Sequence, residues 1–145
     1  PVVNDSLETS VDGIFACGNV LHVHDLVDFV SQEAAAAGKN AAAYIKAGEK
    51  KVQAEMFPIS PEGGVRYTVP SFVRPSEMEE NLTVRFRVGD VYKNKAIVVY
   101  FDDQLIGKKK RQVMAPGEME QVILKKKKLE EYPETKKIMI RIEEA

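Results

Sequence analysis

Leu82-Thr83-Val84-Arg85-Phe86-Arg87-Val88 is the stretch of sequence that decides the fold. Its apolar residues alternate with polar ones, and this period of two residues is typical of a β-strand with one buried face. The segment 96–101 is apolar and rich in β-branched residues, which indicates a central strand with both faces covered. The sequence therefore predicts a β-sheet structure around these two segments.

Further strand patterns surround this pair, and turn signals separate them. Asp102-Asp103 predicts a hairpin turn, and Pro116-Gly117 predicts a second turn. The additional predicted strands are 53–57, 66–69, 104–106, 122–124 and 138–142. Short strands with turn signals at close intervals are typical of a β-sandwich, and we expect one of immunoglobulin-like type. The sequence has no tryptophan and only one cysteine, so the expected likeness is one of architecture alone.

The first third of the chain differs from the rest in charge and in texture. Residues 1–50 carry three basic and seven acidic groups, whereas the remainder carries 18 basic and 15 acidic groups. The change of sign coincides with a change from small residues to strand-forming ones. We therefore expect two units, residues 1–50 and residues 51–145.

The N-terminal unit has the pattern of a strand, a turn and a helix. Ile14–Cys17 is a short apolar run that ends at Gly18-Asn19, as a buried strand does at a tight turn. A long helix should begin near Leu26, with Asp25 as its N-cap. Its expected apolar face is rich in alanine, which allows close approach of a neighbouring sheet. The residues of that face are Phe29, Val30, Ala34, Ala37, Ala41 and Ile45.

The segment Thr9-Ser10-Val11-Asp12-Gly13-Ile14-Phe15-Ala16-Cys17-Gly18-Asn19, followed by the alanine-rich helix, resembles a known cofactor motif. It is similar to the second FAD motif of the pyridine nucleotide-disulfide oxidoreductase superfamily, T-x-x-x-G-(I/V)-(F/Y)-A-x-G-D. The resemblance covers about residues 8–46 and does not extend to the β unit. It implies that residues 1–50 are the C-terminal remnant of a Rossmann-like FAD domain.

The resemblance also implies which residues contact the flavin. Gly18 would allow close approach of the backbone, because glycine has no Cβ. Asn19 would be the partner of a ribityl hydroxyl, in place of the usual aspartate, and its uncharged amide would make a weaker contact. Asp25, Leu26 and Val27 would present backbone N–H groups and the positive end of the helix to the pyrimidine oxygen or the pyrophosphate.

The function implied is that of a C-terminal fragment of a flavin-dependent NAD(P)-type oxidoreductase. The chain begins at Pro1 without the start of a domain, so we expect the rest of the FAD domain to be its partner. The paired G-x-G-x-x-G motif is absent from the sequence. We therefore expect FAD in the full-length parent, and neither bound FAD nor catalysis in the isolated fragment. The sequence of residues 22–28 has a weaker resemblance to proteins associated with glycerol-3-phosphate dehydrogenase systems.

Several other interpretations are weighed against this one. His22, His24 and Asp25 could ligate a metal, but their spacing matches no common zinc motif, and we expect no metal. Cys17, alone in an apolar run, is expected to be an inert hydrophobic residue. The lysine runs at 108–111 and 125–128 lack interleaved aromatic residues, which favours a solvated or protein-binding surface over nucleic acid. The alternative function is a non-catalytic interaction module whose β unit docks a partner subunit.

The overall composition restricts the class of protein. The chain of 145 residues is 44% hydrophobic and 30% charged, with a formal net charge of −1. These values are ordinary for a folded globular protein and provide no general attraction to nucleic acid or anionic lipid. The sequence has no signal peptide and no apolar run long enough to span a membrane. We expect a cytoplasmic protein without a membrane span.

Overall fold

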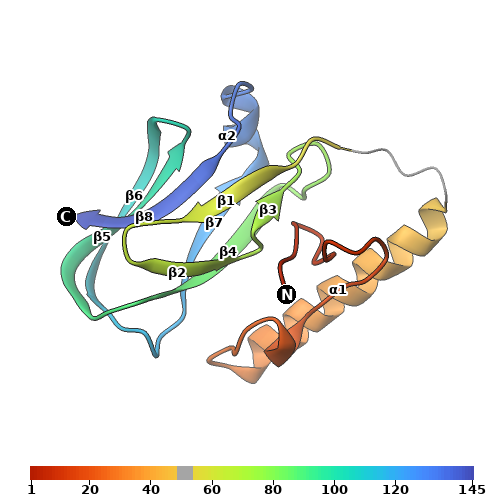
Figure 1. Ribbon diagram of the computed structural model, residues 1–145, viewed down its shortest axis with the longest axis horizontal. Coiled ribbons are helices and arrows are strands. Elements are labelled where there is room, and N and C mark those ends of the chain that lie inside the picture. Colours follow the sequence, from red (N-terminus) through yellow and green to blue (C-terminus); the bar gives the residue numbers. More distant parts are fainter. Residues whose placement is uncertain (49–53) are drawn as a thin grey trace.

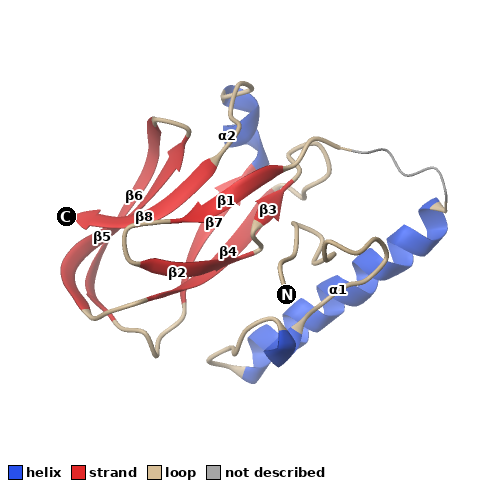
Figure 2. Ribbon diagram, viewed as in Figure 1, coloured by secondary structure: helices blue, strands red, loops and turns tan. Residues whose placement is uncertain are grey.

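The structure is a computed structural model and describes residues 1–48 and 54–145. Within these ranges the protein is a mixed α+β structure in which most elements are strands and one helix is long (Figures 1 and 2). The helical elements are η1 (Gly18–Val20), α1 (Val27–Ala47) and α2 (Lys126–Glu131). The strands are β1 (Phe57–Pro61), β2 (Val65–Val69), β3 (Phe72–Val73), β4 (Asn81–Val88), β5 (Tyr92–Phe101), β6 (Gln104–Met114), β7 (Glu120–Lys125) and β8 (Ile138–Glu144).

The strands form two sheets that share one apolar core. The larger sheet has the order β3-β1-β8-β5-β6, and the smaller has the order β2-β4-β7. All strand pairs are antiparallel except β1 with β8, which run parallel. Ile59, Ile97 and Ile140 from the larger sheet and Val84 and Phe86 from the smaller sheet are fully buried in a single cluster. The β unit is therefore two sheets that pack face to face.

Most of the predicted strands are confirmed. Residues 82–88 lie in β4, residues 96–101 in β5, residues 66–69 in β2, residues 122–124 in β7 and residues 138–142 in β8. Asp102-Asp103 forms the two-residue turn between β5 and β6, and Asp102 adopts a positive φ of 51°. Ala96 to Val99 are all buried, as a strand covered on both faces requires.

Some predicted boundaries in the β unit are wrong. The predicted strand 53–57 contains Gln53, which lies outside the described residues, and residues 54–56 form no strand, so that only Phe57 belongs to β1. The lysines at 125–128 span the end of β7 and the start of helix α2, which begins at Lys126 and was not predicted. Leu129 is buried beneath this helix, and that single apolar anchor is too weak a signal to predict a helix from sequence.

The N-terminal unit confirms the helix but not the strand before it. Helix α1 begins one residue later than predicted, at Val27. Ile14–Cys17 forms no strand, because its pairing consists of one isolated bridge between Glu8 and Phe15. The Ile14 carbonyl accepts the Thr9 N–H at 2.7 Å and the Ala16 N–H donates to the Leu7 carbonyl at 3.0 Å, but these two hydrogen bonds flank a single residue pair and do not extend into a continuous ladder.

Two details of the predicted helix are also wrong. Its N-cap is Leu26, not Asp25, and no side chain caps the first turn. The Asp25 carboxylate is instead bound by the β unit, where it accepts hydrogen bonds from Met119 N–H and Arg87. On the predicted apolar face Ala37 is buried, but Ala34 and Ile45 are exposed, and Glu33 is buried in their place.

The N-terminal unit packs against the smaller sheet and the end of β3. Arg74 binds the carboxylate of Asp5 through Nε at 3.1 Å and through a terminal nitrogen at 3.3 Å. The Ser71 N–H donates to the carbonyl of Val3 at 2.9 Å, and Val3 is buried in an apolar cluster with Val69 of β2. The predicted boundary between residues 50 and 51 lies outside the described residues. No helix of the described chain is both long and apolar enough to cross a membrane.

Candidate functional site

A buried carboxylate organises the segment that resembles the FAD motif. Glu33 of α1 is only 7% exposed, and its Oε1 accepts the Gly18 N–H at 2.7 Å. Its Oε2 contacts Nε2 of His22 at 3.1 Å and Nε2 of His24 at 3.0 Å. We name this cluster of Glu33, His22, His24 and the Gly18 N–H the Glu33 hub. It fastens the turn and the following loop to one position of the helix.

The hub satisfies the conditions under which a buried carboxylate is stable. Burial works to raise the pKa of Glu33, but hydrogen bonds from His22, the Gly18 N–H and His24 together lower it below its ordinary value of 4.5. An ionised carboxylate only accepts hydrogen bonds, so each histidine donates from Nε2. Neither Nδ1 atom, on His22 or on His24, has a partner among the described residues.

The hub contains the ligand atoms that a metal centre would need, but its two histidines are better suited to hydrogen bonds with Glu33 than to metal binding. One ligand atom each from His22, His24 and Glu33 lies within 4.8 Å of the others, and all three residues are buried. Asp25, the third ligand considered from the sequence, faces Arg87 instead. If a metal bound Nε2 of both histidines, each Nδ1 would carry a hydrogen, which metal-bound histidines normally donate to a partner. The two buried Nδ1–H groups would then have no acceptor among the described residues. Two buried donors without acceptors cost more free energy than the two unused Nδ1 lone pairs of the hydrogen-bonded arrangement.

The turn after the motif requires a glycine at its first position. Gly18 has a positive φ of 70°, a conformation that costs other residues energy. Its carbonyl accepts the N–H groups of Leu21 and His22, which closes the short 3-10 helix η1. A Cβ at this position would meet only Val30, at 3.9 Å, so the outer side of the turn is open. The next residue, Asn19, is exposed.

The N-terminal end of α1 is the second part of the predicted flavin surface. Asp25, Leu26 and Val27 are all exposed, and Val27 is 76% exposed. No side chain caps the first turn, and the Phe29 N–H donates to the Leu26 carbonyl at 3.2 Å, so the N–H groups of Val27 and Asp28 are those that the positive end of the helix offers to a ligand. The Asp25 carboxylate is engaged by Met119 and Arg87. Burial works to raise its pKa, but these two hydrogen bonds outweigh burial and lower the pKa. Only the backbone of Asp25 therefore remains for a ligand.

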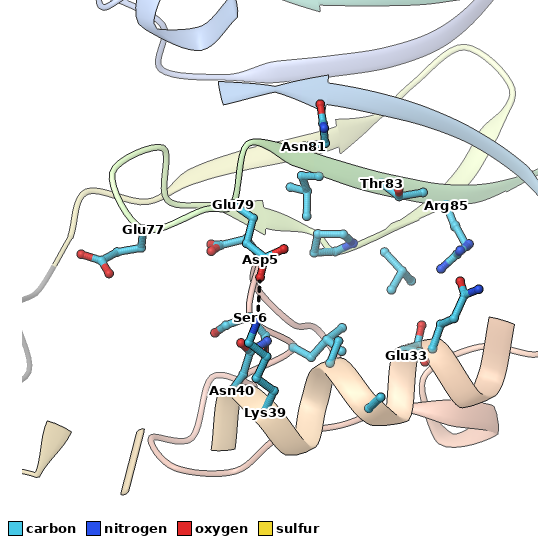
Figure 3. Close-up of a pocket in the computed structure, with 17 residues that line it drawn as sticks. Asp5, Ser6, Glu33, Lys39, Asn40, Glu77, Glu79, Asn81, Thr83 and Arg85 are labelled. Atoms are coloured by element: carbon cyan, nitrogen blue, oxygen red, sulfur yellow. Dashed lines mark hydrogen bonds and ion pairs between the residues drawn. The ribbon is translucent and has the colours of Figure 1, made fainter. Parts of the chain in front are cut away.

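A polar groove of about 540 Å³ runs between α1 and the smaller sheet. Glu33, Lys39 and Asn40 line it from the helix, and Thr83 and Arg85 line it from β4 (Figure 3). The Arg85 guanidinium lies over the ring of Phe29, 4.9 Å from its centroid. The groove is therefore the seam along which the helix meets the sheet, with the hub at its inner wall.

Glu33 is the residue that the sequence analysis missed. The predicted helix placed Phe29, Val30 and Ala37 on one face, and Glu33 lies on the same face by helical spacing. An acidic residue among apolar positions of a helix is a signal for a buried hydrogen-bonded group. Cys17, which sequence analysis placed on a buried strand, is partly buried and free.

No protein-family model, curated protein or solved structure gives a significant match to this chain.

Proposed function

We propose that residues 1–50 form the last FAD-contacting segment of a flavin-dependent NAD(P)-type oxidoreductase. In the parent protein, the flavin would carry electrons between a nicotinamide and an acceptor. The observation that carries this proposal is the arrangement at Gly18. A motif-bearing turn with an obligatory glycine is fastened to α1 by Glu33, and it leaves Asn19 and the uncapped helix end exposed.

The exposed groups are suited to the contacts that the resemblance implies. The amide of Asn19 can accept a hydrogen bond from a ribityl hydroxyl and can also donate one. The N–H groups at the start of α1 and the positive end of the helix would favour the pyrophosphate or the electron-rich pyrimidine side of reduced flavin. The hub contributes by holding the turn and the helix in one fixed relation.

The strand expected at 14–17 does not form, so the support for this proposal is the Gly18 turn and helix α1, not a complete unit of strand, turn and helix. In an FAD domain, the segment 14–17 would pair with neighbouring strands supplied by the rest of that domain. The described residues offer it only the bridge from Glu8, so it is left extended without a sheet. The exposed Val20, Val23 and Val27 are apolar residues that the rest of the domain would cover.

We further propose that the β unit is an appended sandwich of immunoglobulin-like type. The support for this proposal is its two facing sheets, with one core shared between them. The parallel pairing of β1 with β8 brings the first and last strands of the unit side by side in one sheet.

The reading frame upstream of Pro1 provides the first test of this proposal. We expect a long extension that opens with a strand and a G-x-G-x-x-G turn, because the diphosphate needs that cradle. An initiation codon directly before Pro1 would contradict the proposal. It would instead favour the interaction module considered from the sequence.

A further inference from the structure

The two sheets of the β unit both end in a strand with an unpaired edge on the same side. Among the described strands β6 pairs only with β5, and β7 pairs only with β4. A pocket of about 220 Å³ and another of about 290 Å³ lie between β6 and β7. Both are lined by Val99, Gly107 and Ile123, so they form one groove. We name it the β6–β7 groove.

The groove is apolar at its floor and open at one end. Val99, Phe101 and Leu124 are buried core residues that also line it. Ile123 on β7 is 56% exposed and lines both pockets, so the groove presents an apolar side chain to solvent. At the other end, Arg111 of β6 binds Glu120 of β7 at 3.0 Å and holds the two edges together. The sheets are therefore joined at one end and separated beside Gly107.

The rim of the groove is strongly basic, although the whole chain is nearly neutral. The segment 104–128 contains eight basic and only two acidic residues. Lys109 on β6 and Lys125 on β7 line the groove from its two sides, and both are exposed. Glu120 is paired with Arg111, and Lys128, which also lines the groove, is paired with Glu131 at 3.1 Å. The remaining lysines give the rim an excess of positive charge that favours an anionic occupant.

We propose that the β6–β7 groove receives an extended acidic segment of a partner protein, which adds to the free edge of β6 as an extra strand. Strand addition supplies backbone hydrogen bonds along β6 from Gln104 to Lys110, up to the point where the Arg111–Glu120 contact closes the groove. Alternate side chains of the added strand point to opposite faces, so apolar ones would enter the groove beside Gly107 and Lys109, while acidic ones would meet Lys108 and Lys110 on the other face of β6. Two copies of β6 would place lysines opposite lysines, which disfavours self-association. This inference is independent of the proposed flavin function.

The test uses a fluorescent peptide of about nine residues in which glutamate alternates with valine. One control peptide has lysine in place of glutamate, and another has serine in place of valine. We expect saturable binding of the acidic apolar peptide alone, measured by fluorescence anisotropy. We also expect it to weaken when salt rises from about 50 mM to about 300 mM. Equal binding of the serine peptide, or of a single-stranded oligonucleotide, would mean general attraction to lysine and would overturn the proposal.

Variants of the whole chain locate the binding surface. The pair Lys108→Glu and Lys110→Glu, on the face of β6 that the acidic side chains would meet, should weaken peptide binding at least about tenfold. The matched pair Lys39→Glu and Lys46→Glu, which makes the same charge change on α1, should leave it unchanged. If both pairs weaken binding equally, or neither does, the proposal is wrong.

A groove-filling variant provides a second readout that does not alter charge. A Cβ at Gly107 would meet no atom within 4 Å, so Gly107→Phe can be accommodated while its ring occupies the groove. We expect the variant to unfold at the same or a higher denaturant concentration than the parent chain and to lose peptide binding. Ile45→Phe on the exposed side of α1 is the control. Unchanged binding by a folded Gly107→Phe protein would overturn the proposal.

Discussion

Glu33 is the residue on which the geometry of the N-terminal unit depends, because it accepts hydrogen bonds from Gly18, His22 and His24. Glu33→Gln keeps the shape of the side chain but removes its charge. Its amide NH₂ group, which cannot accept a hydrogen bond, would face one or more of the donors that now bind the carboxylate. We expect the free energy of unfolding to fall by about 2–4 kcal/mol, since a buried charged acceptor is lost while its donors stay buried. Urea denaturation measures this change.

The matched control is Glu79→Gln. Glu79 is 79% exposed and its ion pair with Lys39 lies at the surface, so its loss should change stability by less than about 0.5 kcal/mol. A Glu33→Gln protein as stable as this control would show that the hub does not hold the turn.

The lowered pKa of Glu33 predicts the direction of a pH effect. Because its folded pKa lies below the ordinary value of 4.5, the carboxylate stabilises the fold fully above that value, and this contribution is lost as pH falls through the folded pKa. The stability difference between the parent chain and Glu33→Gln should shrink as the pH falls below about 5. A difference that instead grows as the pH falls below about 5 would contradict this assignment.

Two glycines of the N-terminal unit should respond to alanine in opposite directions. Gly18→Ala meets no close atom but forces an alanine to a φ of 70°, so we expect a loss of about 1–2 kcal/mol. Gly38→Ala lies in the middle of α1 with nothing within 4 Å, and we expect a gain of about 1 kcal/mol. Thermal unfolding of both variants is the measurement. A neutral Gly18→Ala would mean that the turn relaxes to another conformation.

At the scale of elements, the local sequence pattern was sufficient to locate strands that have one buried face. The alternation in Leu82–Val88 and at Ile138, Ile140 and Ile142 located β4 and β8, because a period of two residues follows directly from the pleat. Helix α1 was located by its long run without proline and its alanine content. Strand formation at Ile14–Cys17 could not be predicted from pattern, because it depends on neighbours that sequence pattern does not show.

The candidate site was predictable only in part, because the roles of its side chains depend on hydrogen-bonding partners from distant parts of the chain. Gly18 and the start of α1 were located from the motif and the helix signal. The roles of Asp25 and Glu33 depend on contacts across the chain, where Arg87 binds the former and His22 and His24 bind the latter. Sequence spacing could place these side chains on a helix or a loop but could not show which donor each would meet.

The contact between the N-terminal segment and the end of β3 leads to a prediction about how these two elements are held together. Arg74 binds both carboxylate oxygens of Asp5 and also the hydroxyl of Ser6 at 2.9 Å. Arg74→Lys keeps the charge but cannot form this two-pronged contact. We expect faster hydrogen exchange of the amides in residues 2–9 and a stability loss of about 1–2 kcal/mol.

Arg66→Lys is the control for this prediction, because Arg66 is exposed on β2 and forms no ion pair with the described residues. Exchange in residues 2–9 should match the parent chain in this variant. Equal exchange in Arg74→Lys and Arg66→Lys would mean that the Asp5 contact does not hold the segment in place.

For the whole molecule, the change of charge and texture near residue 50 predicted two kinds of structure, and the described ranges contain a helical N-terminal unit and a two-sheet β unit. These parts are joined by polar contacts, such as Arg87 with Asp25 and with the carbonyl of Val23. The activity proposed for the parent belongs to the N-terminal unit. The β6–β7 groove lies between two strands of the β unit, so the two proposals can be tested separately.

The most direct test of the central claim is the flavin content of the protein purified together with whatever coding sequence precedes Pro1. We predict the visible absorption of oxidised flavin at about one flavin per chain. The 145-residue chain alone, purified in parallel, should show none, because it lacks the G-x-G-x-x-G cradle. A longer protein without flavin after reconstitution with FAD, or a 145-residue chain with stoichiometric flavin, would contradict the account.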